Sequence, residues 1–197
     1  MKVRKPPTVS KSAVPKKRPF ARKNYHKLLL NGVEFRLNDV AIVKEATDEH
    51  SYGRILRIWR EPGEELQAFI RLRWFYKPSD VFDEVPEYLS EEELFESDHE
   101  QDVFVQTING KVKVLGLEEY LALDNLTEDV FFTRAKFCAA TRTLEPSVEA
   151  WERVCSCKSI LSPSAEYVRC SECEQRFHPA CVKLAASVPD WVCSACR

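Results

Sequence analysis

The stretch that decides the fold of the C-terminal part of the chain is V-C-S-C-K-S-I-L-S-P-S-A-E-Y-V-R-C-S-E-C-E-Q-R-F-H-P-A-C-V-K-L-A-A-S-V-P-D-W-V-C-S-A-C-R, residues 154–197. It contains seven of the eight cysteines of the 197-residue chain. Tetrahedral zinc takes four thiolate or imidazole ligands, so eight such residues predict two structural zinc sites. A disulfide framework fits paired cysteines with a histidine less well. The predicted ligands are Cys155, Cys157, Cys170, Cys173, His178, Cys181, Cys193 and Cys196.

The ligand order, four cysteines, a histidine and three cysteines, resembles that of a PHD finger. A RING domain, the alternative, places its histidine after three cysteines. The resemblance implies a cross-brace, in which the first and third ligand pairs share one zinc ion and the second and fourth share the other. About 43 residues form too small an apolar core, so metal binding must supply the folding energy. Trp191 stands where such fingers pack an aromatic side chain.

Thiols used as zinc ligands imply a reducing compartment, the cytosol or the nucleus. We expect a nuclear protein, because residues 15–19 (P-K-K-R-P) are similar to a nuclear-localisation patch. A basic arm that only solubilises the chain is the alternative. No apolar run is long enough for a membrane span, and no signal peptide is recognisable.

Charge is distributed unevenly along the chain. Residues 1–27 contain ten Lys or Arg and no acid, and we expect this arm to be disordered and able to contact DNA. The remaining residues contain 19 basic and 31 acidic side chains. Eleven of the acids lie within residues 80–102, a stretch that would attract a cationic partner such as a histone tail.

Between the arm and the cysteine-rich stretch, short apolar runs alternate with turn residues. Asn-Gly pairs at 31–32 and 109–110 predict two β-hairpins, over 28–37 and 103–114. Further strands are expected at 40–43, 52–59, 67–76 and 130–137, and short helices near 90–95 and 117–122. The pattern is typical of a mostly β, barrel-like domain over residues 28–146, followed by a finger over residues 150–197.

Three segments of the predicted barrel resemble the BAH–PHD chromatin readers of plants and fungi. They are R-L-R-W-F-Y-K-P at 71–78, E-L-F-E-S-D-H at 93–99 and T-I-N-G-K at 107–111. The resemblance implies a BAH-type β-barrel-like domain before a cross-brace two-zinc PHD finger. It also implies an effector of Polycomb-type silencing that binds histone H3 trimethylated on lysine 27.

The resemblance places a methyl-lysine cage at Tyr52, Trp74 and Tyr76. Aromatic faces attract a quaternary ammonium through their quadrupoles, and Trp74 and Tyr76 share one face of a strand. The alternative is that these rings are ordinary barrel core. The resemblance further assigns His99, Asp98 and Asp102 to contacts with the histone peptide. In the family one residue usually separates the histidine from the following Asp, whereas here Glu100 and Gln101 precede Asp102.

The finger departs from readers of histone H3 trimethylated on lysine 4. At the three positions where those readers place their methyl-lysine cage, this chain has Leu161, Arg176 and Tyr167, of which only Tyr167 is aromatic. We therefore expect no binding of that mark. The finger could bind an unmodified H3 N-terminus, bind another protein, or only support the barrel.

We expect that the chain is not an enzyme and has no small-molecule substrate, because no catalytic nucleophile, phosphate-binding loop or catalytic carboxylate pair is recognisable in the sequence. A zinc-finger ubiquitin ligase is the enzymatic alternative. Among binding functions, the alternatives are another mark, on lysine 4 or 9 of H3 or lysine 20 of H4, and a nucleosome or protein interaction module that ignores methylation. Proteins of a silencing complex are further expected partners.

Overall fold

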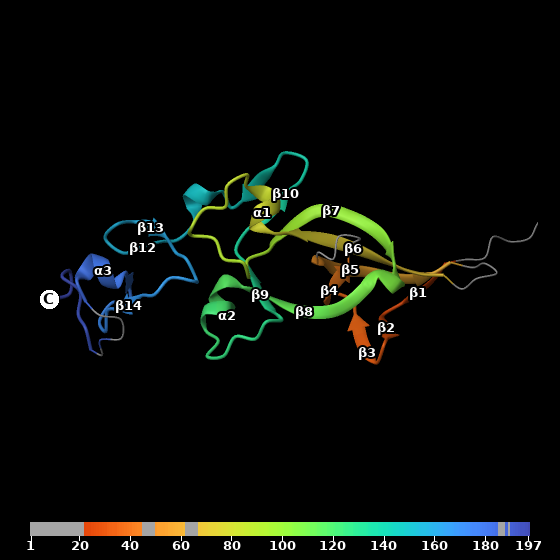
Figure 1. The fold of residues 1–197 in the computed structure, drawn as a ribbon, viewed down its shortest axis with the longest axis horizontal. Helices are drawn as coiled ribbons and strands as arrows, with labels where there is room; N and C mark the ends of the chain where they lie inside the picture. Colours follow the sequence, from red (N-terminus) through yellow and green to blue (C-terminus); the bar gives the residue numbers. More distant parts are fainter. Residues whose placement is uncertain (1–21, 45–49, 62–66, 185–187, 189) are drawn as a thin grey trace, which may run out of the picture.

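The computed structural model describes residues 22–44, 50–61, 67–184, 188 and 190–197. Its main element is a nine-stranded sheet in the order β11-β10-β7-β6-β5-β4-β8-β9, with β1 added beside β5. The molecule is elongated, with the sheet in one part and the cysteine-rich module at the C-terminal end (Figure 1). The strands of the sheet are β1 Lys23–Tyr25, β4 Val40–Lys44, β5 His50–Arg60, β6 Ala68–Tyr76, β7 Phe95–Phe104, β8 Ile108–Gly116, β9 Val130–Thr133, β10 Lys136–Cys138 and β11 Thr143–Glu145.

The first predicted hairpin is confirmed. Strands β2 (Lys27–Leu30) and β3 (Val33–Arg36) pair antiparallel across Asn31 and Gly32. Both turn residues have positive φ, 49° and 82°, as a type I′ turn requires. The sequence therefore determines this hairpin locally.

The second predicted hairpin is wrong. Strand β7 ends at Phe104, a 3₁₀ turn covers Val105–Thr107, and β8 runs without a turn through Asn109 and Gly110. Strand β8 pairs with β4, not with β7. A Cβ on Gly110 would lie 3.1 Å from Cδ1 of Ile42, so this glycine permits close packing of two strands.

Two other expectations need correction, and one is confirmed. No described helix covers 90–95, where Glu93 instead bridges to Phe132. The strand expected over 130–137 is divided, because Arg134 and Ala135 separate β9 from β10. The helix expected near 117–122 is present as α2, Leu117–Leu121. A further short helix, α1 (Pro78–Val81), follows β6.

The arm was predicted to be disordered through residue 27, and its last part is ordered. Strand β1 pairs antiparallel with β5, with Lys23 opposite Arg60. Lys27 already belongs to β2. Backbone pairing to an unfilled sheet edge thus overrides the polar composition. The prediction for residues 1–21 lies outside the described residues.

Alternating side chains divide the sheet into two faces. On β6, Ile70, Leu72 and Trp74 belong to one apolar cluster with Phe35 and Ile55. Phe75 points to the other face and packs with Val40, Leu94 and Val112. None of the described helices is long and apolar enough to cross a membrane.

The cysteine-rich module consists of short pieces that share a core with the sheet domain. Trp151 and Ile160 from the module pack with Phe95 and Phe137 from the sheet. The module therefore docks on the barrel through apolar contacts. Its elements are a 3₁₀ turn at Val148–Ala150, β12 Arg153–Val154, β13 Ser159–Ile160, β14 Val168–Arg169, β15 Arg176–Phe177 and α3 Pro179–Val182.

Candidate functional site

The eight predicted ligands form two clusters with the pairing expected of a cross-brace. One cluster contains Cys155, Cys157, His178 and Cys181, and the other contains Cys170, Cys173, Cys193 and Cys196. Within each cluster the ligand atoms lie within 4.8 Å of one another. Sulfurs bound tetrahedrally to one zinc ion are about 3.8 Å apart, given Zn–S bonds of about 2.3 Å.

Individual distances fit a metal centre. The sulfurs of Cys173 and Cys193 are 3.9 Å apart, and Nδ1 of His178 lies 3.4 Å from Sγ of Cys157. The backbone N–H of Cys193 donates to Sγ of Cys170 at 3.3 Å. This bond stabilises the thiolate and lowers the pKa of Cys170 to about 6. The donor sets Cys₃His and Cys₄ are those of structural zinc, and each cluster could hold one ion.

Trp74 and Tyr76 lie beside an irregularity in the pairing of β6 and β7. Arg73 faces Glu100 but Phe75 faces Glu96, so β7 contains extra residues at 97–99. The hydroxyl of Ser97 donates to the carbonyl of Trp74 at 2.8 Å and accepts the N–H of His99 at 3.1 Å. Bulges of this kind redirect side chains next to binding sites.

The bulge brings His99 to Tyr76. The Tyr76 hydroxyl and Nδ1 of His99 are 3.1 Å apart, with ring centroids separated by 6.4 Å. Nε1 of Trp74 donates to Oε1 of Gln101 at 3.2 Å. Trp74 and Tyr76 are only partly buried. The structure therefore joins Tyr76 and His99, whereas Trp74 is linked to His99 only through Ser97 and its side chain packs against a different apolar cluster from that of Tyr76. Gln101, which sequence reasoning missed, lies beside Trp74 because it is paired with Leu72.

Tyr52 is placed differently. It lies opposite Phe75, and directly opposite residues of antiparallel strands share a face. Tyr52 is therefore on the face away from Trp74 and Tyr76. Its ring packs on Phe131 at 4.8 Å, and the ammonium of Lys77 stands 5.8 Å from the ring centroid. Tyr52 lines a separate cavity of about 460 Å³, and burial raises the pKa of its hydroxyl.

The two predicted peptide-binding acids have partners within the chain. Asp102 forms a bidentate pair with Arg71, at 2.7 and 3.0 Å, on the face opposite Trp74. Asp98 accepts the backbone N–H of Ala139 at 2.8 Å and lies 3.4 Å from Sγ of Cys138. The Ala139 N–H and the Cys138 thiol lower the pKa of Asp98. Cys138, the cysteine outside the C-terminal array, is half-buried.

In the module, the three positions compared with a methyl-lysine cage have other contacts. Leu161 is 1% exposed. Arg176 pairs with Glu152 at 3.3 Å. The ring of Tyr167 lies 5.0 Å from that of His178, and its hydroxyl accepts the N–H of Ser162. These residues therefore serve the metal cluster and the junction.

The junction contains a buried ion pair that sequence reasoning missed. Arg134 donates to both carboxylate oxygens of Glu93, at 2.6 and 2.9 Å, and to the carbonyl of Leu161 at 2.7 Å. Its guanidinium lies 4.8 Å from the Trp151 ring centroid. Burial raises the pKa of Glu93, and Arg134 opposes this shift. The family-like segment at 93–99 begins with Glu93, but nothing in the sequence indicates that Glu93 is buried or that it pairs with Arg134.

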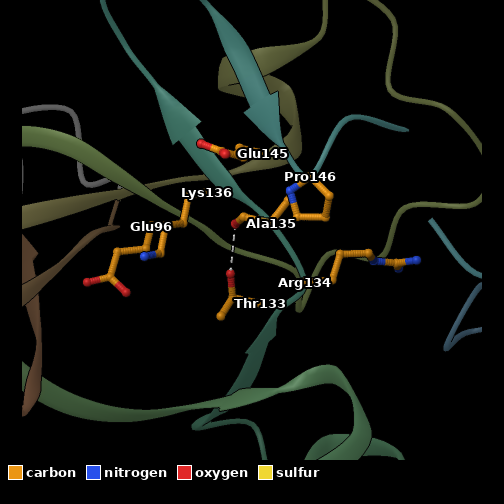
Figure 2. Close-up of a pocket in the computed structure, with 7 residues that line it drawn as sticks. All are labelled: Glu96, Thr133, Arg134, Ala135, Lys136, Glu145 and Pro146. Atoms are coloured by element: carbon orange, nitrogen blue, oxygen red, sulfur yellow. Dashed lines mark hydrogen bonds between the residues drawn. The ribbon is translucent and has the colours of Figure 1, made fainter. Parts of the chain in front are cut away.

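A cavity of about 720 Å³ lies where β9 and β10 separate. Figure 2 shows its lining residues, with the hydroxyl of Thr133 bonded to the carbonyl of Ala135. The side chain of Arg134 points away from Glu96 and Lys136 (Figure 2), toward the module whose Leu161 it contacts. The break between the two strands, which the sequence did not indicate, is thus the point from which Arg134 reaches the module.

The fold and the two clusters define the class of protein, a mostly β barrel domain followed by a small module compatible with two PHD-like zinc sites. Residues 33–146 match the model of the BAH domain. The match covers more than half of the chain, and the chain belongs to the BAH domain family.

Curated relatives include two proteins of Arabidopsis thaliana. The chain is 32% identical to "Chromatin remodeling protein SHL" over 136 residues, 66% of this chain and 58% of that protein. It is 30% identical to "Chromatin remodeling protein EBS" over 131 residues, 64% of this chain and 55% of that protein. The matches thus span less than two thirds of these relatives.

Among solved structures, the yeast Rsc2 BAH domain superposes with a TM-score of 0.50 at 15% identity, over 62% of this chain and 53% of that one. At this identity the likeness supports the fold alone. These similarities bear out the resemblance found in the segments at 71–78, 93–99 and 107–111.

Proposed function

We propose that the chain is a nuclear, non-enzymatic chromatin reader that binds the histone H3 tail trimethylated on lysine 27 and acts in Polycomb-type silencing. The proposal rests on Tyr76, which contacts His99 at the bulge of residues 97–99, and on Trp74, which is partly buried two residues earlier on the same strand. Membership in the BAH family and the names of the two Arabidopsis relatives support a role on chromatin.

The chemistry of the pair suits a quaternary ammonium. Such a cation has no hydrogen to donate, and the faces of Trp74 and Tyr76 attract it by about 0.5–2 kcal/mol per ring. Hydrogen bonds to Gln101 and His99 restrain both rings, which reduces the entropy lost on binding. Only the family resemblance supports Tyr52 as the third aromatic residue of the methyl-lysine cage. In the structure the ammonium of Lys77 already lies over the ring of Tyr52.

Calorimetry with H3 peptides tests the proposal. We expect a peptide trimethylated on lysine 27 to bind, and Trp74→Ala to weaken binding about tenfold or more. Tyr52→Ala should weaken binding less, because this side chain lies on the other sheet face. Phe104→Ala is the matched control, since Phe104 is 48% exposed and packs on Phe69, away from the site.

Equal affinity for the unmodified and trimethylated peptides would sink the proposal, as would full binding by Trp74→Ala. A peptide array with marks on lysines 4, 9 and 27 of H3 and lysine 20 of H4 identifies the preferred mark. Preference for a mark other than trimethylated lysine 27 would contradict the proposed specificity for lysine 27. It would still support the proposal that the chain reads methyl-lysine.

We further propose that the PHD-like module does not read H3 trimethylated on lysine 4 and instead supports the barrel. Leu161 is buried, and its carbonyl accepts a hydrogen bond from Arg134. A cationic ligand would also meet the guanidinium of Arg176. The array tests this directly, because lysine 4 binding that depends on Tyr167 would contradict it.

A further inference from the structure

Strand β1 brings two cations together without a neutralising acid. Lys23 lies directly opposite Arg60 of β5, and both side chains are exposed. Like charges opposite one another on paired strands destabilise a sheet. No carboxylate among the described residues forms an ion pair with either cation. Instead, Lys23 Nζ lies 5.4 Å and Arg60 Cζ 5.8 Å from the centroid of one ring, that of Tyr25.

The opposite face of the same strand pair repeats this arrangement. Arg57 and Arg22 lie 5.4 and 5.8 Å from the ring centroid of the buried Trp59. Arg57 also donates to the amide oxygen of Asn24 at 2.9 Å. Of these four cations only Arg22 forms an ion pair with an acid within the described residues, Glu61 at 2.7 Å.

The other exposed arginines of the sheet are paired with acids. Arg71 binds Asp102, Arg73 binds Glu100, and Arg36 binds Glu34, each at 2.7 Å. These partners cancel most of the local positive charge. An aromatic ring, in contrast, holds a cation in place without neutralising it. On the β1–β5 ribbon the charge without an acidic neighbour among the described residues is therefore that of Lys23 and Arg60, since Asp102 interacts with Arg57 electrostatically.

Two further observations concern the distribution of charge along the chain and the position of β1. Residues 1–21, directly before the ribbon, contain seven Lys or Arg and no acid. Strand β1 also lies at the end of the molecule away from α3 and the cysteine-rich module (Figure 1). Residues 28–197, by contrast, carry 31 acids and 19 basic residues. The positive charge is thus gathered at one end of an acidic body.

We infer that the β1–β5 ribbon binds the phosphate backbone of duplex DNA through Lys23 and Arg60, which share one face. The chemistry is sequence-independent, because cations that contact phosphates release counterions and read no bases. The surface is separate from Trp74 and Tyr76, so it holds or fails independently of the proposed histone site. On a nucleosome it would supply a second contact beside that of the histone tail.

The test is fluorescence anisotropy of the full chain with a short labelled duplex, across about 50–200 mM salt. Each phosphate contact adds about 0.9 to the slope of log K against log salt. Lys23→Gln with Arg60→Gln should therefore lower the slope by about 2 and weaken binding on the order of tenfold or more. Lys23→Arg with Arg60→Lys should retain binding, because both charges are kept.

Lys113→Gln with Lys136→Gln is the matched control, since both lysines are exposed on strands elsewhere in the sheet. An unchanged slope for the Lys23/Arg60 variant, or an equal loss for the control, would overturn the inference. So would binding to anionic phospholipid vesicles but not to the duplex. If the double variant unfolds in a thermal scan, the exposed Lys23→Gln alone serves, with an expected slope change of about 1.

Discussion

The barrel and the cysteine-rich module obtain their stability from different sources. The barrel buries large apolar side chains in several clusters, among them Phe35, Ile55, Ile70 and Leu72. The main apolar cluster within the described part of the module consists of Val168, Cys170, Trp191 and Cys193, and its two cysteines are predicted metal ligands. A short chain without a large apolar core thus depends on metal coordination, whereas the barrel depends on packing.

The junction between the barrel and the module combines apolar packing with a buried ion pair. Apolar side chains of the module, Trp151 and Ile160, enter the same cluster as Phe95 and Phe137 of the barrel. Within this contact lies the ion pair of Arg134 and Glu93, with side chains 5% and 0% exposed. The module is therefore docked on the barrel from outside, and metal ions in its two clusters would hold it from inside. The three changes that follow separate these contributions.

Removal of the metal should have the largest effect. Structural zinc contributes about 10 kcal/mol or more to the folding of small fingers, so chelation should unfold the module and leave the barrel sheet intact. Cys193→Ser should do the same at one cluster. Hydrogen exchange resolved by segment is the measurement, with loss of protection expected in residues 153–184 and retention in β4–β8.

Cys138→Ser is the matched control, because Cys138 lies outside both clusters. Retained protection of the module after complete chelation would show that docking on the barrel suffices. A concurrent loss of the barrel would show that the two regions fold as one unit.

Loss of Arg134 should have the next largest effect. Arg134→Leu leaves the Glu93 carboxylate buried without a cation, which typically costs about 3–5 kcal/mol. The matched control is Arg71→Leu, because Arg71 and Asp102 form a bidentate pair whose side chains are 43% and 37% exposed. The control should cost about 0–1 kcal/mol. Urea unfolding of both variants gives the free energies.

Replacing both members of the buried pair separates charge burial from packing. Arg134→Leu with Glu93→Leu should recover part of the loss, because no uncompensated charge remains. Equal destabilisation by Arg134→Leu and Arg71→Leu would contradict a special role for the junction.

The smallest of the three effects is a pH dependence within the barrel. The pKa of Asp98 is lowered by the N–H of Ala139 and the thiol of Cys138, so the folded state favours its carboxylate. This contribution is present above the ordinary pKa of 3.8 and is lost as the pH falls through 3.8 toward the lowered value. Asp98→Asn should remove that part of the acid sensitivity.

The measurement is the free energy of urea unfolding of the native chain and Asp98→Asn at neutral and acidic pH. The difference between the two proteins should shrink as the pH falls. A difference that stays constant with pH would show that Asp98 contributes through geometry and not through its charge.

Much of this architecture could be predicted from local sequence. The Asn31-Gly32 hairpin forms because both residues accept positive φ, and that preference belongs to the dipeptide. The same pair at 109–110 did not form a turn because β8 continues through it in pairing with β4, where Gly110 lies opposite Ile42. Short-range signals therefore predicted elements well only where no distant strand competed.

In the candidate site, too, some features follow from the local sequence and others from the pairing of distant strands. Trp74 and Tyr76 share a face because side chains alternate along a strand, which the sequence predicted. The position of Tyr52 depends on how β5 is aligned with β6, and the alignment opposite Phe75 placed it on the other face. The bulge at residues 97–99, which delivers His99, likewise follows from the pairing of two strands.

The sequence by itself determined the eight candidate metal ligands and their order, the mostly β fold and the family, because these depend on residue type and spacing along the chain. Only the tertiary structure decided which aromatic rings meet, how Arg134 and Glu93 join the module to the barrel, and that Lys23 lies beside Arg60. These depend on contacts between residues distant in sequence, whose register and burial are set by the packing of the whole sheet.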